Sequence, residues 1–452
     1  MSRLGSSVLI LFLAVVALGG VYSAWRVDQS FVGESDFPGY YTAALLVRYG
    51  QSAQIYSGQS GVDPIEVPSD PHSFFARTAQ AHGIRNVPLY DYPLTLADLL
   101  VPFTLLSPFS ALLLWEATTA LFLVGSGILL ARLMGLRQPA QTAAVIALIL
   151  FFRPTVAAFV YGQVSVLLLF LVVAGLYCCE RGRSTQAGLW IAIAIAIKFT
   201  PLVLVIPLLA WRDWKTLRAV ALGCLSILGV LLLLNGPEAL SLYFFHRVPA
   251  MAHAFIDLTN LNLRTAAQVF WYGTDMVAPT LASLWAGRLL SLLVLLYAAW
   301  LIRARRSIHW SNSQRLIAAS VFLLFSACVS PIAWRHAYVL AVLALLFLGR
   351  RIWQGRAHPL ETALVLWFIL ALSTDKFDKW AWHFEDLGFS MLAMMPPLLG
   401  VALGLLELHR LRRERAEDDR EEAIIVPSAI SLSRDCSFRA KAAPFGIARG
   451  AG

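Results

Sequence analysis

Charge is what this 452-residue sequence has least of. Asp, Glu, Lys and Arg make up only 14% of its residues, whereas 58% are hydrophobic and the mean hydropathy is +0.68. Soluble globular domains carry about 25% charged residues, so this composition excludes an ordinary water-soluble domain. The apolar residues form continuous runs and do not alternate with polar ones. This pattern predicts an all-α polytopic membrane protein rather than a β-barrel.

Cysteines and cofactor motifs are also scarce. The five cysteines do not suit a disulfide framework, and no Cys/His spacing typical of a metal site occurs. The sequence has no Walker motif and no nucleotide-binding glycine fingerprint. We therefore expect no metal and no cofactor, and ATP-driven transport is disfavoured. The net charge of +9 lies largely in short clusters between apolar runs, which is typical of membrane topology and not of nucleic-acid binding.

Twelve apolar segments are candidate membrane spans. Several are shorter than the roughly 20 residues that a helix needs to cross a bilayer. They cover residues 7–24, 110–131, 139–152, 164–179, 186–197, 201–211, 216–234, 279–302, 316–330, 338–348, 360–372 and 388–406.

Basic clusters recur after every second span and define the topology. The side that carries them is expected to be cytoplasmic, which places both termini inside the cell. The clusters are Arg132/Arg137, Arg181/Arg183, Arg212/Lys215/Arg218, Arg303/Arg305/Arg306 and Arg350/Arg351/Arg356. The same alternation makes residues 93–106 a re-entrant or interfacial helix. It also makes residues 186–211 a hairpin that breaks at 198–201, where Pro201 disfavours helix.

The predicted outer face carries the unusual sequence. Its longest loop covers residues 25–92, within a membrane domain of residues 1–406. Residues 407–452 are expected to form a cytoplasmic tail that begins as a charged helix over 407–422 and ends in a disordered stretch. The first apolar segment, 7–24, is either a retained anchor, which fits an even span count, or a cleaved signal peptide.

Asp36 is the first candidate for chemistry, because it lies shortly after that segment on the predicted outer face. A carboxylate at the membrane surface can act as a general base on a substrate that arrives from the bilayer. The following Phe37-Pro38 is equally typical of a helix N-terminus that leads into residues 39–49, with Asp36 as its cap. The sequence leaves both roles open, and they do not exclude each other.

Two further outward positions carry cations in apolar surroundings. Lys198 follows a long apolar run, where an ammonium is costly unless it is paired; it could bind a phosphate or extend to the interface from a helix end. The turn Trp334-Arg335-His336 combines an aromatic ring, a cation and an imidazole. Arg335 could bind a phosphate and His336 could assist proton transfer, although an interfacial His and Trp can be structural.

Weaker signals complete the candidate set. The motif 161–163 opens a span from the outer side, so Gly162 would allow a ligand to approach the backbone and Gln163 could bind a hydroxyl group. Arg264 is another outward cation that could bind substrate, and solvent exposure is the simpler alternative for it.

Taken in chain order, these motifs form a pattern. The outward Asp36 is followed by Tyr90-Asp91-Tyr92-Pro93, Ala111 to Trp115, Gly162-Gln163-Val164, Ala187-Gly188-Leu189 with Lys198-Phe199-Thr200-Pro201, and Ser330-Pro331-Ile332-Ala333-Trp334-Arg335-His336. From about Asp36 to His336, the chain resembles glycosyltransferase family 87, the polyprenyl-phosphate-mannose-dependent mannosyltransferases of the GT-C superfamily.

The resemblance implies a GT-C bundle with a periplasmic active site, a polyprenyl-phosphate sugar as donor and a glycan or glycolipid as acceptor. It also implies that Asp36 is the catalytic base, that Lys198 and His336 surround the substrates, and that Tyr92 lies among them. The chain departs from the family at Leu94, where a proline is frequent, and at Arg335, where an acid is frequent. The identity of the sugar and of the acceptor therefore stays open.

The residues are consistent with an inverting transfer in which Asp36 takes the acceptor proton and cations stabilise the leaving phosphate. A transporter or lipid-linked sugar flippase is the main alternative, because twelve spans and broken helices are common there. A non-catalytic assembly factor is another. The absence of an internal repeat, and the concentration of polar residues on one face, favour the enzyme.

Overall fold

The computed structural model describes residues 35–56, 70–85, 87–253, 258–272, 281–303, 310–373 and 389–436. Every regular element in these ranges is a helix and none is a strand, which confirms the predicted all-α class. The α-helices are α2 (Phe37–Arg48), α3 (Phe74–Ala81), α4 (Leu94–Leu100), α5 (Pro108–Leu133), α6 (Pro139–Phe151), α7 (Arg153–Val160), α8 (Ser165–Glu180), α9 (Ser184–Ile197), α10 (Val205–Ala210), α11 (Trp214–Ser241), α12 (Val248–His253), α13 (Leu263–Tyr272), α14 (Leu281–Ile302), α15 (Asn312–Val329), α16 (Val342–Trp353), α17 (Pro359–Ser373) and α19 (Met395–Cys436). Shorter 3₁₀ segments are η1 (Ser52–Ile55), η2 (Val101–Leu105), η3 (Thr200–Leu204), η5 (Arg335–Ala341) and η7 (Phe389–Met394), and η4 (Leu242–Arg247) is a π-helix.

Six helical segments in the described ranges are long and apolar enough to cross a membrane, and the bent pair α6–α7 could form a seventh span. Five more apolar helices are shorter than a full span. The predicted count of about twelve spans is not confirmed, and its first member, residues 7–24, lies outside the described residues. Short helices account for the difference, because hydropathy alone does not distinguish a broken or partly buried helix from a full span.

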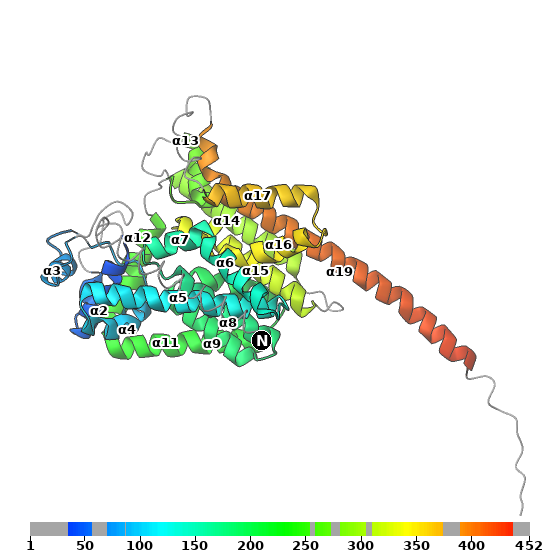
Figure 1. The fold of residues 1–452 in the computed structure, drawn as a ribbon, viewed down its shortest axis with the longest axis horizontal. Coiled ribbons are helices and arrows are strands. Elements are labelled where there is room, and N and C mark those ends of the chain that lie inside the picture. Colours follow the sequence, from blue (N-terminus) through cyan, green and yellow to red (C-terminus); the bar gives the residue numbers. More distant parts are fainter. Residues whose placement is uncertain are drawn as a thin grey trace, which may run out of the picture.

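The predicted break at Lys198 is confirmed. Helix α9 ends at Ile197, Lys198 adopts an extended conformation, and the chain re-forms as η3 and α10 with Pro201 in the first turn of η3. The predicted re-entrant or interfacial segment is the short pair α4–η2, which ends at Leu105. The charged helix expected at 407–422 lies within α19, which begins earlier, at Met395, and extends away from the bundle (Figure 1).

The long helices of the bundle lie side by side, and α2, α3, α4 and α12 gather toward the left end of Figure 1. Small residues allow the close contacts. At Gly188 of α9, an added methyl group would lie 2.4 Å from the Ala219 Cβ of α11. Small residues allow helix backbones to approach in apolar bundles, where packing replaces the hydrophobic effect. This contact holds α9, and therefore Lys198 at its end, in a defined position.

Candidate active site

Asp36 directly precedes α2 but does not cap it with its side chain. No amide of α2 donates to the carboxylate; instead, Gln163 Nε2 donates a hydrogen bond to Asp36 Oδ2. The predicted helix start is confirmed, because α2 begins at Phe37 with Pro38 in its first turn. The predicted side-chain cap is wrong, since the carboxylate faces the α7–α8 junction rather than its own helix.

The backbone around Asp36 is held by the turn at 161–163. Asp36 N donates to the carbonyl of Tyr161 at 3.0 Å, and Trp115 Nε1 donates to the carbonyl of Gly162 at 2.9 Å. Gly162 has φ +61°, and a Cβ there would lie 3.1 Å from both Phe37 Cβ and Ser35 Oγ. The glycine therefore allows the Asp36 segment to lie directly against the turn that carries Gln163.

Gly162→Ala is expected to reduce activity more than stability alone explains. The left-handed backbone costs an alanine roughly 1–2 kcal/mol, and the new methyl group pushes on Phe37 and Ser35, the neighbours of Asp36. Gly135→Ala is the matched control, because Gly135 has φ +70° and an added methyl group there would have no atom within 4 Å. Thermal denaturation and initial rates of both variants test this; equal rates in the two would contradict the proposed contact.

Gln163 is buried and links Asp36 to two tyrosines. Its Oε1 accepts hydrogen bonds from Tyr92 Oη at 2.8 Å and Tyr40 Oη at 3.3 Å. The hydroxyl donors require the amide oxygen on their side, so the amide NH₂ faces the carboxylate. Gln163 thus fixes the direction of the Asp36 carboxylate.

Lys198 supplies positive charge to the same cluster. Its ammonium lies 5.1 Å from the ring centre of Tyr92, and its charge acts on both Asp36 and Asp91. The end of α9 releases the side chain from the helix, so the proline break has a direct consequence for the site. The predicted proximity of Lys198 to Asp36 is therefore present in the structure.

Burial raises the pKa of Asp36 to about 7, and the neighbouring Asp91 carboxylate adds to this. Lys198 and the hydrogen bonds from Gln163 and Tyr40 act in the opposite direction. The side chain keeps partial solvent access. A carboxyl group that titrates near neutral pH, and that a substrate can reach, has the properties of a general base.

Asp91 and Arg247 are site residues that sequence reasoning missed. Arg247, in η4, is 2% exposed, and its Nε donates to Asp91 Oδ1 at 2.7 Å, with Nη2 on the same oxygen. Its Nη1 is buried and has no hydrogen-bond partner within the described part of the chain. Asp91 stands in the motif 90–93, next to Tyr92, and that was the available signal. No sequence signal pointed to Arg247, because it follows an aromatic run that matches no motif.

His336 lies in η5 and is 4% exposed. Its ring lies 5.8 Å from that of Trp334 and 6.4 Å from that of Tyr161, whose carbonyl holds Asp36. The charge of Lys198 also acts on His336. The structure therefore brings the Trp334–His336 turn to the edge of the Asp36 cluster.

Two predicted substrate contacts point elsewhere. Arg335 Nη1 donates to the carbonyl of Leu372 at 3.3 Å, toward α17. Arg264 is 5% exposed, so the expectation that it is solvated is wrong; its Nη1 donates to the carbonyl of Ala252 at 2.6 Å, and its backbone packs on Gly287 of α14. Their roles in substrate binding stay predictions.

Among the described residues, no group of three or more His, Cys, Asp or Glu side chains could hold a metal ion. The arrangement around Asp36 contains one partly accessible carboxylate, an amide that orients it, and two buried or half-buried cations near a second carboxylate. Such a set can remove a proton from a hydroxyl group and stabilise negative charge on a departing phosphate.

The model of glycosyltransferase family 87 matches residues 90–331, which is more than half of the chain. The chain belongs to this family. It is therefore a glycosyltransferase, and the transporter and assembly-factor alternatives are not supported. Gln163, Lys198, Asp91 and Arg247 lie inside the matched range, whereas Asp36 lies outside it and is joined to them by the hydrogen bond to Gln163.

Curated relatives agree with this family. A "polyprenol-phosphate-mannose-dependent alpha-(1-2)-phosphatidylinositol mannoside mannosyltransferase" of Mycolicibacterium smegmatis is 26% identical over 74% of this chain and 80% of its own length. A "polyprenol-phosphate-mannose-dependent alpha-(1-2)-phosphatidylinositol pentamannoside mannosyltransferase" of Mycobacterium tuberculosis is 29% identical over 62% of this chain and 61% of its own length. Among solved structures, ArnT from Cupriavidus metallidurans bound to undecaprenyl phosphate matches with a TM-score of 0.36 and 14% identity, over 93% of this chain and 80% of that one.

Proposed function

We propose that the protein transfers a mannosyl unit from a polyprenyl-phosphate sugar to a glycan or glycolipid acceptor, with inversion, on the periplasmic side of the bacterial inner membrane. The observation that carries the proposal is the Asp36 carboxylate, held by Gln163 and adjacent to the charge of Lys198. The printed names of the relatives, which are polyprenol-phosphate-mannose-dependent enzymes, support the choice of donor. In this topology both termini are cytoplasmic.

In the proposed reaction the acceptor hydroxyl oxygen attacks the anomeric carbon, and the carbon–oxygen bond to the phosphate breaks. The proton passes to Asp36, and the bonding electrons leave with the polyprenyl phosphate. A phosphate ester is a good leaving group, so no general acid is needed. Lys198, and Arg247 through its unpartnered Nη1, would stabilise the phosphate charge as it develops.

Asp91 would then act on Arg247 rather than on the substrate. It holds two nitrogens of the guanidinium, which leaves Nη1 for the phosphate. The pair also balances charge: a buried guanidinium alone would be costly. Asp91 is thus proposed as a positioning residue.

The rate is expected to depend on pH through Asp36. Its pKa of about 7 means that the base is protonated and inactive in most molecules below pH 7. The kcat/KM for the acceptor should therefore fall by about tenfold per pH unit below that pKa and level off above it. Initial rates between pH 5 and 9 measure this, with donor binding followed at the same pH values as the control. A flat profile between pH 5 and 7 would contradict Asp36 as the base.

The activity itself is tested with purified protein, a radiolabelled polyprenyl-phosphate mannose and a set of glycan and glycolipid acceptors. We expect a new glycosidic bond, and nuclear magnetic resonance of the product should show the anomeric configuration opposite to that of the donor. Retention of configuration would refute the single-step mechanism. Movement of the labelled lipid across a vesicle membrane, without a new glycosidic bond, would instead identify a flippase.

A further inference from the structure

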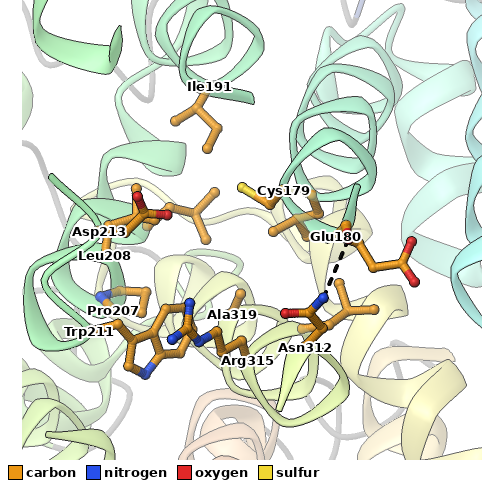
Figure 2. Close-up of a pocket in the computed structure, with 13 residues that line it drawn as sticks. Cys179, Glu180, Ile191, Pro207, Leu208, Trp211, Asp213, Asn312, Arg315 and Ala319 are labelled. Carbon is orange, nitrogen blue, oxygen red and sulfur yellow. Dashed lines mark hydrogen bonds between the residues drawn. The ribbon is translucent and has the colours of Figure 1, made fainter. Parts of the chain in front are cut away.

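A second pocket lies at the other end of the bundle, far from Asp36. It is lined by the C-terminal end of α8, the middle of α9, α10 and the N-terminal half of α15, with Cys179, Leu208, Trp211, Arg315 and Leu316 among its residues (Figure 2). It encloses a cavity of about 70 Å³ and is partly open to solvent. At roughly 10–15 Å³ of probe-sized space per water molecule, a cavity of this size accommodates a group about as small as a phosphate.

Helix lengths separate the two sites. Gln163 directly precedes the segment that leads into α8, whereas Cys179 and Glu180 end that helix. At 1.5 Å per residue, the path from Gln163 to Cys179 is about 24 Å. Helix α9 likewise begins near the pocket and ends beside Lys198, and α15 begins with Asn312 and Arg315 and ends before the turn that carries His336. The pocket is therefore no part of the site described above.

Arg315 is the charged residue in this pocket. Its guanidinium lies 5.7 Å from the ring centre of Trp211, and its Nε is buried with no hydrogen-bond partner in the described ranges. Leu204, Leu208 and Leu316 supply an apolar wall beside it. A buried donor without a partner costs free energy, so the arrangement favours a ligand that brings an acceptor.

Two carboxylates line the pocket, and neither is paired with Arg315 by a hydrogen bond. Asp213 caps α11, where it accepts from Thr216 N at 3.2 Å and from Thr216 Oγ1 at 2.8 Å. The Glu180 carboxylate points away from Arg315 in Figure 2, while its backbone carbonyl accepts from Asn312. The cation in the pocket is therefore available to an external anion.

Exposed cations follow the lining residues in the sequence. Arg181 and Arg183 follow the Glu180 end of α8, and Arg212, Lys215 and Arg218 follow Trp211. Arg212 also adopts a left-handed backbone, φ +58°, at a helix end where glycine is usual. A basic pocket with an apolar wall at the ends of membrane helices has the chemistry that recognises an anionic lipid headgroup.

We propose that this pocket binds the phosphate of a membrane lipid with net negative charge, with Arg315 as the phosphate contact and the first chain carbons against Leu204, Leu208 and Leu316. The lipid would be an anionic phospholipid or a polyprenyl phosphate, which share this chemistry. Phosphatidylcholine would bind poorly, because its choline faces the basic entrance. The proposal does not rest on the transfer reaction.

The test uses the full chain in phosphatidylcholine nanodiscs, alone, with added phosphatidylglycerol, or with added polyprenyl phosphate. Native mass spectrometry and thermal denaturation measure lipid retention and stabilisation. Either anionic lipid should bind the wild type. The lipid that binds at the lower concentration is the one that the pocket prefers. Arg315→Gln should weaken that binding about tenfold or more, because it removes a charge-assisted hydrogen bond.

Arg412→Gln is the matched control, since Arg412 lies 3.9 Å from the ring centre of Trp300, also with an unpartnered buried nitrogen, but on α19 outside the pocket. It should bind lipid like the wild type. Hydrogen exchange of the wild type needs no variant: the anionic lipid should slow residues 208–216 and 311–316 but not 37–48. Equal binding by Arg315→Gln and the wild type, or no slowing at these residues, would overturn the proposal.

Discussion

Asp36→Asn is expected to lower the transfer rate by about 10²–10⁴-fold, the usual contribution of a general base. Asparagine has the same shape and keeps an oxygen that can accept from Gln163 Nε2, so the site should stay assembled. Only the capacity to take the acceptor proton is lost. Initial rates with saturating donor measure the effect.

Stability separates this role from a structural one. The folded-state pKa of Asp36, about 7, is above the ordinary value of 3.8. The wild type therefore loses stability as pH rises from 3.8 to about 7, and the loss is complete above it. Asp36→Asn should thus be at least as stable as the wild type at pH 8, with the difference shrinking as pH falls toward 4.

Asp98→Asn is the control carboxylate. Asp98 is partly buried, and its carboxylate accepts from Asn235 of α11 at 2.9 Å rather than from Gln163. We expect its transfer rate to remain close to the wild-type rate. If Asp36→Asn also retained a near-normal rate, Asp36 would not be the base, whatever its stability.

Lys198→Met is expected to lower the transfer rate by about 10²–10³-fold, as the loss of one charge-stabilising donor does elsewhere. Methionine preserves the apolar stem and removes the ammonium that faces the Tyr92 ring. Because the charge of Lys198 lowers the pKa of Asp36, its removal should also shift the acid limb of the pH–rate profile to higher pH. A purely structural defect would not move that limb.

Lys215→Met is the matched control, because Lys215 is an exposed lysine in the first turn of α11. It should leave both the rate and the pH profile unchanged. An unshifted acid limb in Lys198→Met would show that the two groups are not coupled. A loss confined to the KM of the donor would make Lys198 a binding residue and would contradict its role in the transition state.

Local sequence signals predicted several features of the site. Helix α9 cannot continue through Pro201, because proline has no N–H to donate to the carbonyl four residues earlier, and the break places Lys198 outside a helix. Phe37-Pro38 predicted the start of α2, and the motif 161–163 predicted the start of a helix, which is α8. These features follow from the backbone preferences of one or two residues, so they do not depend on distant parts of the chain.

The direction of the charged side chains could not be predicted in this way. Asp36 reaches Gln163, which is 127 positions away in the sequence, instead of the amides of its own helix. Arg247 pairs with Asp91 across 156 positions, whereas Arg335 and Arg264 bond to backbone carbonyls of other segments. Each side chain faces whichever partner the packed helices bring within reach.

By itself, the sequence determined that this is a helical membrane protein. A chain with so little charge and such long apolar runs is suited to a lipid bilayer, where helices satisfy the backbone hydrogen bonds. It also determined that the helix breaks at Lys198. Only the tertiary structure decided that Asp36, Gln163, Lys198, Asp91 and Arg247 form one cluster. The physical reason is that burial and charge coupling, which set the pKa of Asp36, depend on contacts between segments that the sequence keeps far apart.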